Sequence, residues 1–221
     1  MSETPDRRHR LLLVDDHPIV RTGLAALIEA EPDLVVCAQA EDADAAIAAL
    51  ERDKPDLAII DLSLRDSSGL DVVREATRRG LRTLVVSMQD SPVWVERSLS
   101  AGARGYVHKS DAGRTIVVAI RRVLAGRLYV GERLAETLLQ RNMGPAQPRS
   151  AGHPVELLTD RELDVFVRIG RGLSTRHISE ALNISAKTVQ TYRERIKKKL
   201  GLELASELSR EAARWVMEGE R

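Results

Sequence analysis

Aromatic residues and cysteine are scarce in this chain, and each scarcity limits what the protein can be. Phe, Tyr and Trp make up 3% of the 221 residues, whereas hydrophobic residues make up 43%. The cores are therefore predicted to consist of Leu, Val, Ile and Ala. A single cysteine, Cys37, excludes an intrachain disulfide. It lies in the apolar run 34–38, which favours a buried small side chain.

Long apolar segments are also missing. The polar N-terminus, MSETPDRRHR, lacks the apolar core of a signal peptide. No apolar stretch approaches the roughly 20 residues of a membrane-spanning helix. We therefore expect a cytoplasmic protein with no membrane partner. The formal net charge of +1 says little about partners, because the charge is unevenly distributed along the chain.

Short apolar runs alternate with amphipathic segments as far as about residue 128. Several of these runs are apolar throughout, which is typical of parallel strands covered on both faces. The predicted strands are 11–14, 34–38, 57–60, 83–87 and 105–107. The predicted helices are 18–29, 42–52, 69–79, 92–101 and 113–126. This alternation predicts right-handed crossovers and a doubly wound α/β sheet.

The rest of the chain has a different pattern. A helix is predicted over 131–141, and the Pro/Gly-rich stretch 142–154 has no periodicity, as in a linker. Residues from about 155 onward are predicted to be helical. The expected organisation is thus a domain over 10–128, a linker with a helix over 129–154, and a second domain over 155–221.

Polar residues follow four of the predicted strands. Ligands of open parallel sheets bind outside the carboxyl ends of the strands, so these side chains are expected to converge on one crevice. Clustered carboxylates repel one another and usually share a hard cation such as Mg²⁺, and a facing lysine suits a phosphoryl group. The residues are Asp15 and Asp16 after the first strand, Asp61 after the third, Ser87 at the end of the fourth and Lys109 after the fifth.

The C-terminal segment has the pattern of a helix-turn-helix. Thr159 and Glu162 are spaced as a capping box, and Ser174 and Ser185 can cap two further helices. The second of these helices is short, a tight turn follows it, and the third is longer. An apolar stripe on the last helix is interpreted either as domain core or as a dimer seam. Its members are Leu204, Leu208, Ala212 and Trp215.

The longer helix lies in a basic stretch. Residues 168–199 contain nine Lys/Arg and two acids, a net charge of +7. Such a run is usually a solvated helix face, but its coincidence with the helix-turn-helix pattern favours DNA binding, with phosphate contacts for affinity and base contacts for sequence preference. The candidate DNA-contacting residues are Lys187, Thr188, Gln190, Thr191, Arg193, Glu194, Arg195, Lys197 and Lys198.

Both halves resemble known modules. Residues 10–126 resemble a two-component receiver domain through the acidic pair, DLSLRDSSGL at 61–70, VVSM at 85–88 and GYVHKS at 105–110. Residues 157–208 resemble a LuxR-type helix-turn-helix through LTDRELDVF, GLSTRHISEALNIS and KTVQTYRERIKKKLGL. The chain is thus similar to NarL/FixJ-family response regulators. The resemblance implies a flavodoxin-like receiver, with a doubly wound five-stranded parallel sheet, followed by a small all-α helix-turn-helix domain.

The resemblance also implies the parts of a phosphorylation site. Asp61 would be the phosphoacceptor and would take the phosphoryl group from a phosphohistidine of a sensor histidine kinase. Asp16 and Asp61 would bind Mg²⁺ directly, Asp15 would do so through water, and the backbone carbonyl of Ser63 would be a further ligand.

Three more residues receive roles from the resemblance. Lys109 would neutralise the phosphoryl oxygens, Ser87 would hydrogen-bond to the phosphoryl group, and Tyr106 would swing inward. From the residues alone, a half-buried strand aromatic is the alternative interpretation of Tyr106. Phosphorylation would then bias a two-state surface on the fourth helix, the fifth strand and the fifth helix.

The implied function is transcription regulation rather than enzymatic catalysis. Phosphorylation would control dimerisation and sequence-specific binding to a double-stranded DNA operator, with RNA polymerase as a further partner. Two alternatives are a receiver that works without phosphorylation and a Mg²⁺-dependent phosphohydrolase with an Asp nucleophile. The complete acidic site argues against the first. The second is disfavoured because such enzymes often carry two acids in an Asp-x-Asp pattern at one strand end. Here the candidate nucleophile Asp61 follows the third predicted strand, whereas the acidic pair follows the first.

The sequence departs from the family pattern in places. Arg65 stands where proline is common, which loses the fixed φ of proline in that loop. Gln190 and Tyr192 replace the Lys and His of many relatives, and Gln can pair bidentately with adenine. His17 lies beside the acidic pair and is interpreted as a loop residue, not a ligand.

Overall fold

The chain divides into two compact units, Met1–Leu138 and Leu139–Arg221, in the computed structural model. The structure describes residues 7–64, 67–89, 91–143 and 154–219. Most of the Pro/Gly-rich stretch 142–154 therefore lies outside the described residues, and the predicted domain bounds stay predictions. Within the described ranges, no helix is both long and apolar enough to cross a bilayer.

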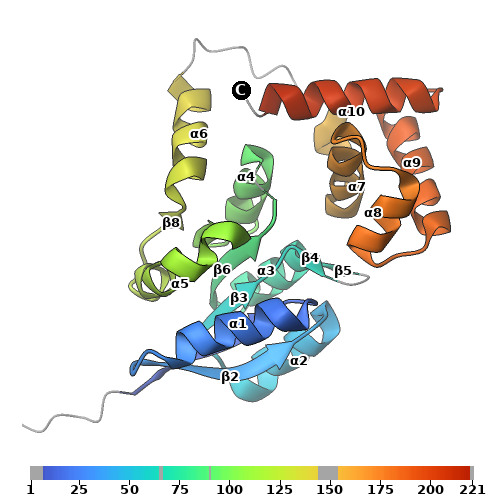
Figure 1. The fold of residues 1–221 in the computed structure, drawn as a ribbon. Helices are drawn as coiled ribbons and strands as arrows, with labels where there is room; N and C mark the ends of the chain where they lie inside the picture. The colour runs from blue at the N-terminus through green and yellow to red at the C-terminus, as the bar shows by residue number, and fades with distance from the viewer. Residues whose placement is uncertain (1–6, 65–66, 90, 144–153, 220–221) are drawn as a thin grey trace, which may run out of the picture. The chain divides into compact units, whose positions relative to one another are not determined.

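The N-terminal unit is a doubly wound α/β domain built on a parallel sheet (Figure 1). The sheet order is β2-β1-β3-β6-β7-β8, and its first five strands follow the 2-1-3-4-5 order of flavodoxin-like folds. The five predicted strands are thereby confirmed. The strands are β1 (His9–Val14), β2 (Leu34–Ala40), β3 (Leu57–Ile60), β6 (Arg82–Ser87), β7 (Gly105–His108) and β8 (Tyr129–Val130).

Two features of the strands were not predicted. The short strand β8 pairs with β7 and adds a sixth member to the sheet. An antiparallel hairpin of β4 (Ser63–Leu64) and β5 (Ser67–Ser68) follows β3. Strands of two residues are too short to show a hydrophobic period, which is why the sequence predicted only five.

The first four helices begin and end within one residue of their predicted positions. The fifth starts four residues earlier than predicted, because His108 caps it by accepting a hydrogen bond from the backbone N–H of Ser110 at 3.3 Å. Lys109 is therefore the first residue of that helix. The helices are α1 (Pro18–Glu29), α2 (Ala43–Asp53), α3 (Gly69–Arg78), α4 (Pro92–Ser100) and α5 (Lys109–Leu124).

Helices cover both faces of the sheet. Alternate residues of a strand point to opposite faces, and Leu11 and Ile59 pack with Ile28 of α1 and Ile116 of α5. Helices α2, α3 and α4 contact the sheet on its other face (Figure 1). Cys37 is only half-buried rather than fully buried as predicted, because β2 is an edge strand.

The C-terminal unit is helical, as predicted. A three-residue turn joins α8 to the longer α9, which is the helix-turn-helix arrangement. Helix α6 spans the boundary between the two units and matches the helix predicted over 131–141. The helices are α6 (Glu132–Met143), the 3-10 turn η1 (Pro154–Leu157), α7 (Asp160–Gly170), α8 (Thr175–Leu182), α9 (Ala186–Leu200) and α10 (Ala205–Gly219).

The caps predicted for this unit are present. Thr159 and Glu162 form the capping box at α7, with Thr159 N–H donating to Glu162 Oε2 at 2.8 Å. The side chains of Ser174 and Ser185 cap α8 and α9, each accepting from a backbone N–H three residues further on. These caps fix where the two helices of the motif begin.

The apolar stripe on α10 belongs largely to the core. Leu208 and Ala212 are fully buried, and the ring of Trp215 packs edge-on against Phe166 of α7, with 5.9 Å between the ring centroids. Leu204 was assigned wrongly to this stripe. It precedes α10 and is 59% exposed, because the helix begins at residue 205.

Glu162 also forms a partly buried ion pair, and the loss of this pair should weaken the unit. Its Oε2 lies 2.6 Å from Lys199 Nζ. Burial opposes the charge, but Lys199 and the Thr159 amide outweigh it and lower the pKa of Glu162. The stabilisation is therefore complete above the ordinary pKa of 4.5 and is lost as the pH falls through the lower pKa of the folded state.

We expect Glu162→Gln to lower the free energy of unfolding of this unit by about 1–3 kcal/mol at pH 7, and to remove the part of the unit's acid sensitivity that Glu162 contributes. Native-state hydrogen exchange of the α7 amides measures this. The control is Glu180→Gln, which breaks an exposed pair with Arg176 and should change stability by under about 0.5 kcal/mol. Equal effects of the two substitutions would contradict the interpretation.

Candidate functional site

Three of the predicted site residues meet at the carboxyl edge of the sheet. Lys109 Nζ lies 2.7 Å from Asp15 Oδ2 and 2.7 Å from Asp61 Oδ2. The three side chains are 8%, 4% and 3% exposed, respectively. A lysine is therefore held between two buried carboxylates that come from different strand ends.

Asp16 and His17 complete an acidic cluster on one side of this contact. One ligand atom from each of Asp15, Asp16, His17 and Asp61 lies within 4.8 Å of all the others. His17 Nδ1 is 2.6 Å from Asp16 Oδ1. The interpretation of His17 as a loop residue apart from the site is therefore incomplete. It lies in the loop before α1, but its ring contacts the acidic pair.

Backbone contacts fix the position of Asp61. Its N–H donates to Val14 O at 2.8 Å, which ties the end of β3 to the end of β1. Its Oδ1 accepts a hydrogen bond from Ser63 N–H at 3.2 Å. The close approach of Gly69 is a further constraint, because a Cβ at that position would lie 1.9 Å from Asp61 O. Gly69 was not predicted from the sequence, since only the tertiary structure brings it against the loop that carries Asp61.

The charges of the cluster are coupled. Burial raises the pKa of Asp61 to about 6, Lys109 opposes this rise and Asp15 adds to it. Burial also opposes the charge on Lys109, but the carboxylates of Asp61 and Asp15 outweigh it and raise the pKa of Lys109. Three acids facing one ammonium leave an excess of negative charge, which a divalent cation with oxygen ligands would neutralise.

Ser87 and Tyr106 lie on β6 and β7, the strands that follow β3 in the sheet order. Ser87 ends β6, is fully buried and accepts a hydrogen bond at Oγ from Gln89 N–H at 3.3 Å. Tyr106 on β7 is also fully buried, so it is not a half-buried strand aromatic, and its hydroxyl donates to Gln89 O at 2.7 Å. Both side chains thus hold the loop that follows β6. Arg65 lies outside the described residues.

Most of the candidate DNA-contacting residues on α9 are exposed. Gln190 Nε2 donates to Glu194 Oε1 at 3.1 Å, and Lys197 Nζ pairs with Glu194 Oε2 at 3.0 Å. Val189 and Ile196 are buried, so the helix packs on one face and presents the other. Three candidates are only half-buried, namely Thr188, Arg193 and Lys197. The exposed ones are Lys187, Gln190, Thr191, Glu194, Arg195 and Lys198.

Comparison with known families identifies both units. Residues 11–121 match the family described as "Response regulator receiver domain". Residues 156–212 match the family described as "Bacterial regulatory proteins, luxR family". The chain belongs to the NarL/FixJ family of response regulators.

Known response regulators match this chain over 61% to 92% of its length. The chain is 34% identical over 198 residues to the transcriptional regulatory protein UhpA of Escherichia coli K12, covering 90% of this chain and 94% of UhpA. Among solved structures, a LuxR-family two-component response regulator from Aurantimonas sp. SI85-9A1 is 35% identical, with a TM-score of 0.59, and the match covers 61% of this chain and 98% of that one. A structure of two RcsB dimers bound to two parallel DNAs, 23% identical, shares the fold with a TM-score of 0.58 over 92% of this chain and 97% of that chain.

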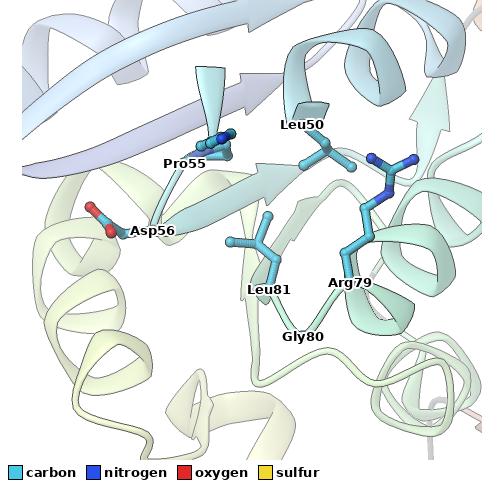
Figure 2. Close-up of a pocket in the computed structure, with 7 residues that line it drawn as sticks. Leu50, Pro55, Asp56, Arg79, Gly80 and Leu81 are labelled. Carbon is cyan, nitrogen blue, oxygen red and sulfur yellow. The ribbon is translucent and has the colours of Figure 1, made fainter. Parts of the chain in front are cut away.

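The receiver also has a pocket at the opposite edge of its sheet (Figure 2). It lies where α2 and α3 end and where β3 and β6 begin, away from the carboxyl ends at which ligands of such sheets bind. It is therefore separate from the acidic site. Its lining residues are Leu50, Lys54, Pro55, Asp56, Arg79, Gly80 and Leu81.

Gly69 offers a direct test of how the receiver positions Asp61. Gly69→Ala should lower the melting temperature and displace the loop that carries Asp61, so that phosphoryl incorporation from a small phosphodonor falls about tenfold or more. The control is Gly113→Ala on α5, where an added Cβ meets nothing within 4 Å. That variant should be neutral or slightly more stable. Normal phosphorylation and stability of Gly69→Ala would refute the close approach.

Proposed function

We propose that a sensor histidine kinase phosphorylates Asp61 and that this modification controls dimerisation and sequence-specific DNA binding. The observation that carries the proposal is the contact of Lys109 Nζ with the carboxylates of both Asp61 and Asp15. A buried ammonium on a buried carboxylate is suited to receive a phosphoryl group on that carboxylate, because it offsets the charge of the incoming oxygens.

The transfer requires little covalent chemistry from the protein. A carboxylate oxygen of Asp61 attacks phosphorus, the P–N bond of the phosphohistidine breaks, and its electron pair stays on the imidazole nitrogen. The product is an acyl phosphate on Asp61. Positioning and charge neutralisation do most of the work in such transfers, and Lys109 and the Ser63 amide supply both here.

The acidic cluster fits a divalent cation, and we propose Mg²⁺. Its donors would be Asp15, Asp16, Asp61 and the carbonyl of Ser63, all oxygen ligands of the kind that Mg²⁺ prefers. The ion would screen the repulsion between these acids and the phosphoryl group. The excess of carboxylates over the single lysine, which helps to raise the pKa of Asp61, supports this assignment.

Helix α5 connects the site to the receiver surface. Lys109 is the first residue of α5, so a new charge on Asp61 acts directly on the start of that helix. Ser87 would hydrogen-bond to the phosphoryl group, which would compete with its contact to the Gln89 amide. Tyr106 holds the carbonyl of the same Gln89, so the state of Ser87 and the orientation of Tyr106 are coupled through one residue.

The proposed output is DNA binding through α9. Its exposed basic face would contact phosphates, and Gln190 would contact base edges in the major groove. The relative RcsB is described as dimers bound to DNA, which supports a homodimer on two half-sites here. RNA polymerase would be the partner through which bound protein affects transcription.

Phosphoryl incorporation from a small phosphodonor tests the first step. Purified protein is incubated with acetyl phosphate and Mg²⁺, and the phosphorylated fraction is measured by intact mass. We expect a mass increase that requires the cation and disappears with EDTA. Incorporation that is independent of divalent cations would contradict the proposed site.

A further inference from the structure

The ring of His17 contacts the acidic cluster and does not cap the helix that follows it. His17 is the residue before α1, and its side chain makes no capping hydrogen bond to that helix. Its backbone N–H donates to Asp15 Oδ1 at 2.8 Å, and the ring has its Nδ1 3.4 Å from the same oxygen and 2.6 Å from Asp16 Oδ1. Pro18 follows at the first helical position and restricts the chain there. The local backbone therefore holds the His17 ring in contact with the acidic pair.

Lys109 and His17 contact different carboxylate oxygens of the cluster. Lys109 takes the Oδ2 atoms of Asp15 and Asp61, whereas His17 faces Asp15 Oδ1 and Asp16 Oδ1. The lysine and the imidazole therefore do not compete for the same oxygens. A cation on the His17 side would leave the lysine where it is.

The spacing of the ligand atoms is close to that of one coordination shell. Around an ion with bonds of about 2.1 Å, adjacent octahedral ligands lie about 3.0 Å apart and opposite ligands about 4.2 Å apart. The ligand atoms of the three acids and His17 all lie within 4.8 Å of one another. The imidazole needs only small side-chain movements to join the carboxylates around a single ion.

We propose that His17 is a further protein ligand of the divalent cation at this site, and that it shifts the site's preference from Mg²⁺ toward transition-metal ions such as Co²⁺ and Mn²⁺. Carboxylates alone suit hard cations, whereas a neutral imidazole nitrogen strengthens binding of first-row transition metals and adds little for Mg²⁺. The inference rests on the proposed cation site and concerns which ion fills it.

Metal titrations of the full-length protein test this. Wild type, His17→Ala and the control His177→Ala, which removes an exposed histidine of the other unit, are titrated with Co²⁺ and with Mg²⁺. We expect His17→Ala to weaken Co²⁺ binding about tenfold or more and Mg²⁺ binding by less than about twofold. His177→Ala should match wild type for both ions.

A spectroscopic measurement identifies the ligand directly. Pulsed EPR of the Mn²⁺-loaded wild type should show nitrogen modulation from a bound imidazole, and His17→Ala should lack it. Equal Co²⁺ affinities and no nitrogen modulation in the wild type would overturn the proposal and leave His17 as an ion-pair partner of Asp16. If Mg²⁺ itself failed to bind the wild type, the proposed phosphorylation site would fail instead, so the two failures can be told apart.

Discussion

Asp61→Asn is expected to reduce phosphoryl incorporation to background. The amide has the shape of the carboxylate but lacks the nucleophilic oxygen that would form the acyl phosphate, so the reaction has no substitute partner. Intact mass after incubation with acetyl phosphate and Mg²⁺ measures the loss, and peptide mapping of the wild type should place the phosphate on Asp61.

The fold of this variant should survive. Burial raises the pKa of Asp61 to about 6, so its ionised form is disfavoured in the folded protein and opposes folding above that pH. An uncharged Asn should therefore give a melting temperature at pH 8 at least equal to that of wild type. Asp71→Asn is the matched control, because Asp71 is an exposed acid on α3 that pairs with Arg74. Undiminished labelling of Asp61→Asn would refute the assignment of the phosphoacceptor.

The second large effect is a loss of DNA affinity, which we expect from substitutions on α9. Lys187 and Lys198 are exposed on the face opposite the buried Val189 and Ile196. Replacing both by Gln should weaken binding to a mixed-sequence 30-base-pair duplex about tenfold or more near 0.1 M salt. If each lysine contacts one phosphate, the slope of log K against log salt concentration should fall by about 1.8.

A control must distinguish the loss of total positive charge from the loss of charge on α9. A control with Arg127→Gln and Arg210→Gln loses the same charge from exposed positions outside α9. It should keep most of the affinity and nearly the whole salt slope. If both double variants lost affinity equally, binding would follow net charge rather than the helix-turn-helix face.

The sequence predicted the parts of the fold that have a strong local signal. The apolar runs that became β1, β3 and β6 are buried on both faces, and this is why they were visible as uninterrupted hydrophobic segments. The capping box at Thr159 was readable because its two side chains satisfy backbone donors within one turn. The start of α5 was missed because His108 is an unusual cap.

The sequence predicted which candidate site residues lie together at the carboxyl edge, but it did not predict their contacts. Strand order places Asp15, Asp61 and Lys109 at one edge, which the general rule for open sheets anticipates. That Lys109 bridges the two acids, that Tyr106 is turned inward and that Gly69 lies against Asp61 are tertiary facts with no sequence period. The contact of the His17 ring with Asp16 is a tertiary fact of the same kind, since no sequence pattern indicates it.

The most direct test of the account is DNA affinity as a function of phosphorylation. A duplex selected by the wild type from a random pool is titrated with phosphorylated and unphosphorylated wild type and with Asp61→Asn treated with the same phosphodonor, at one fixed salt concentration. The account predicts that phosphorylation tightens binding of the wild type about tenfold or more and leaves Asp61→Asn unchanged. Equal affinity of all samples would contradict the account, because the receiver would then not control DNA binding through Asp61.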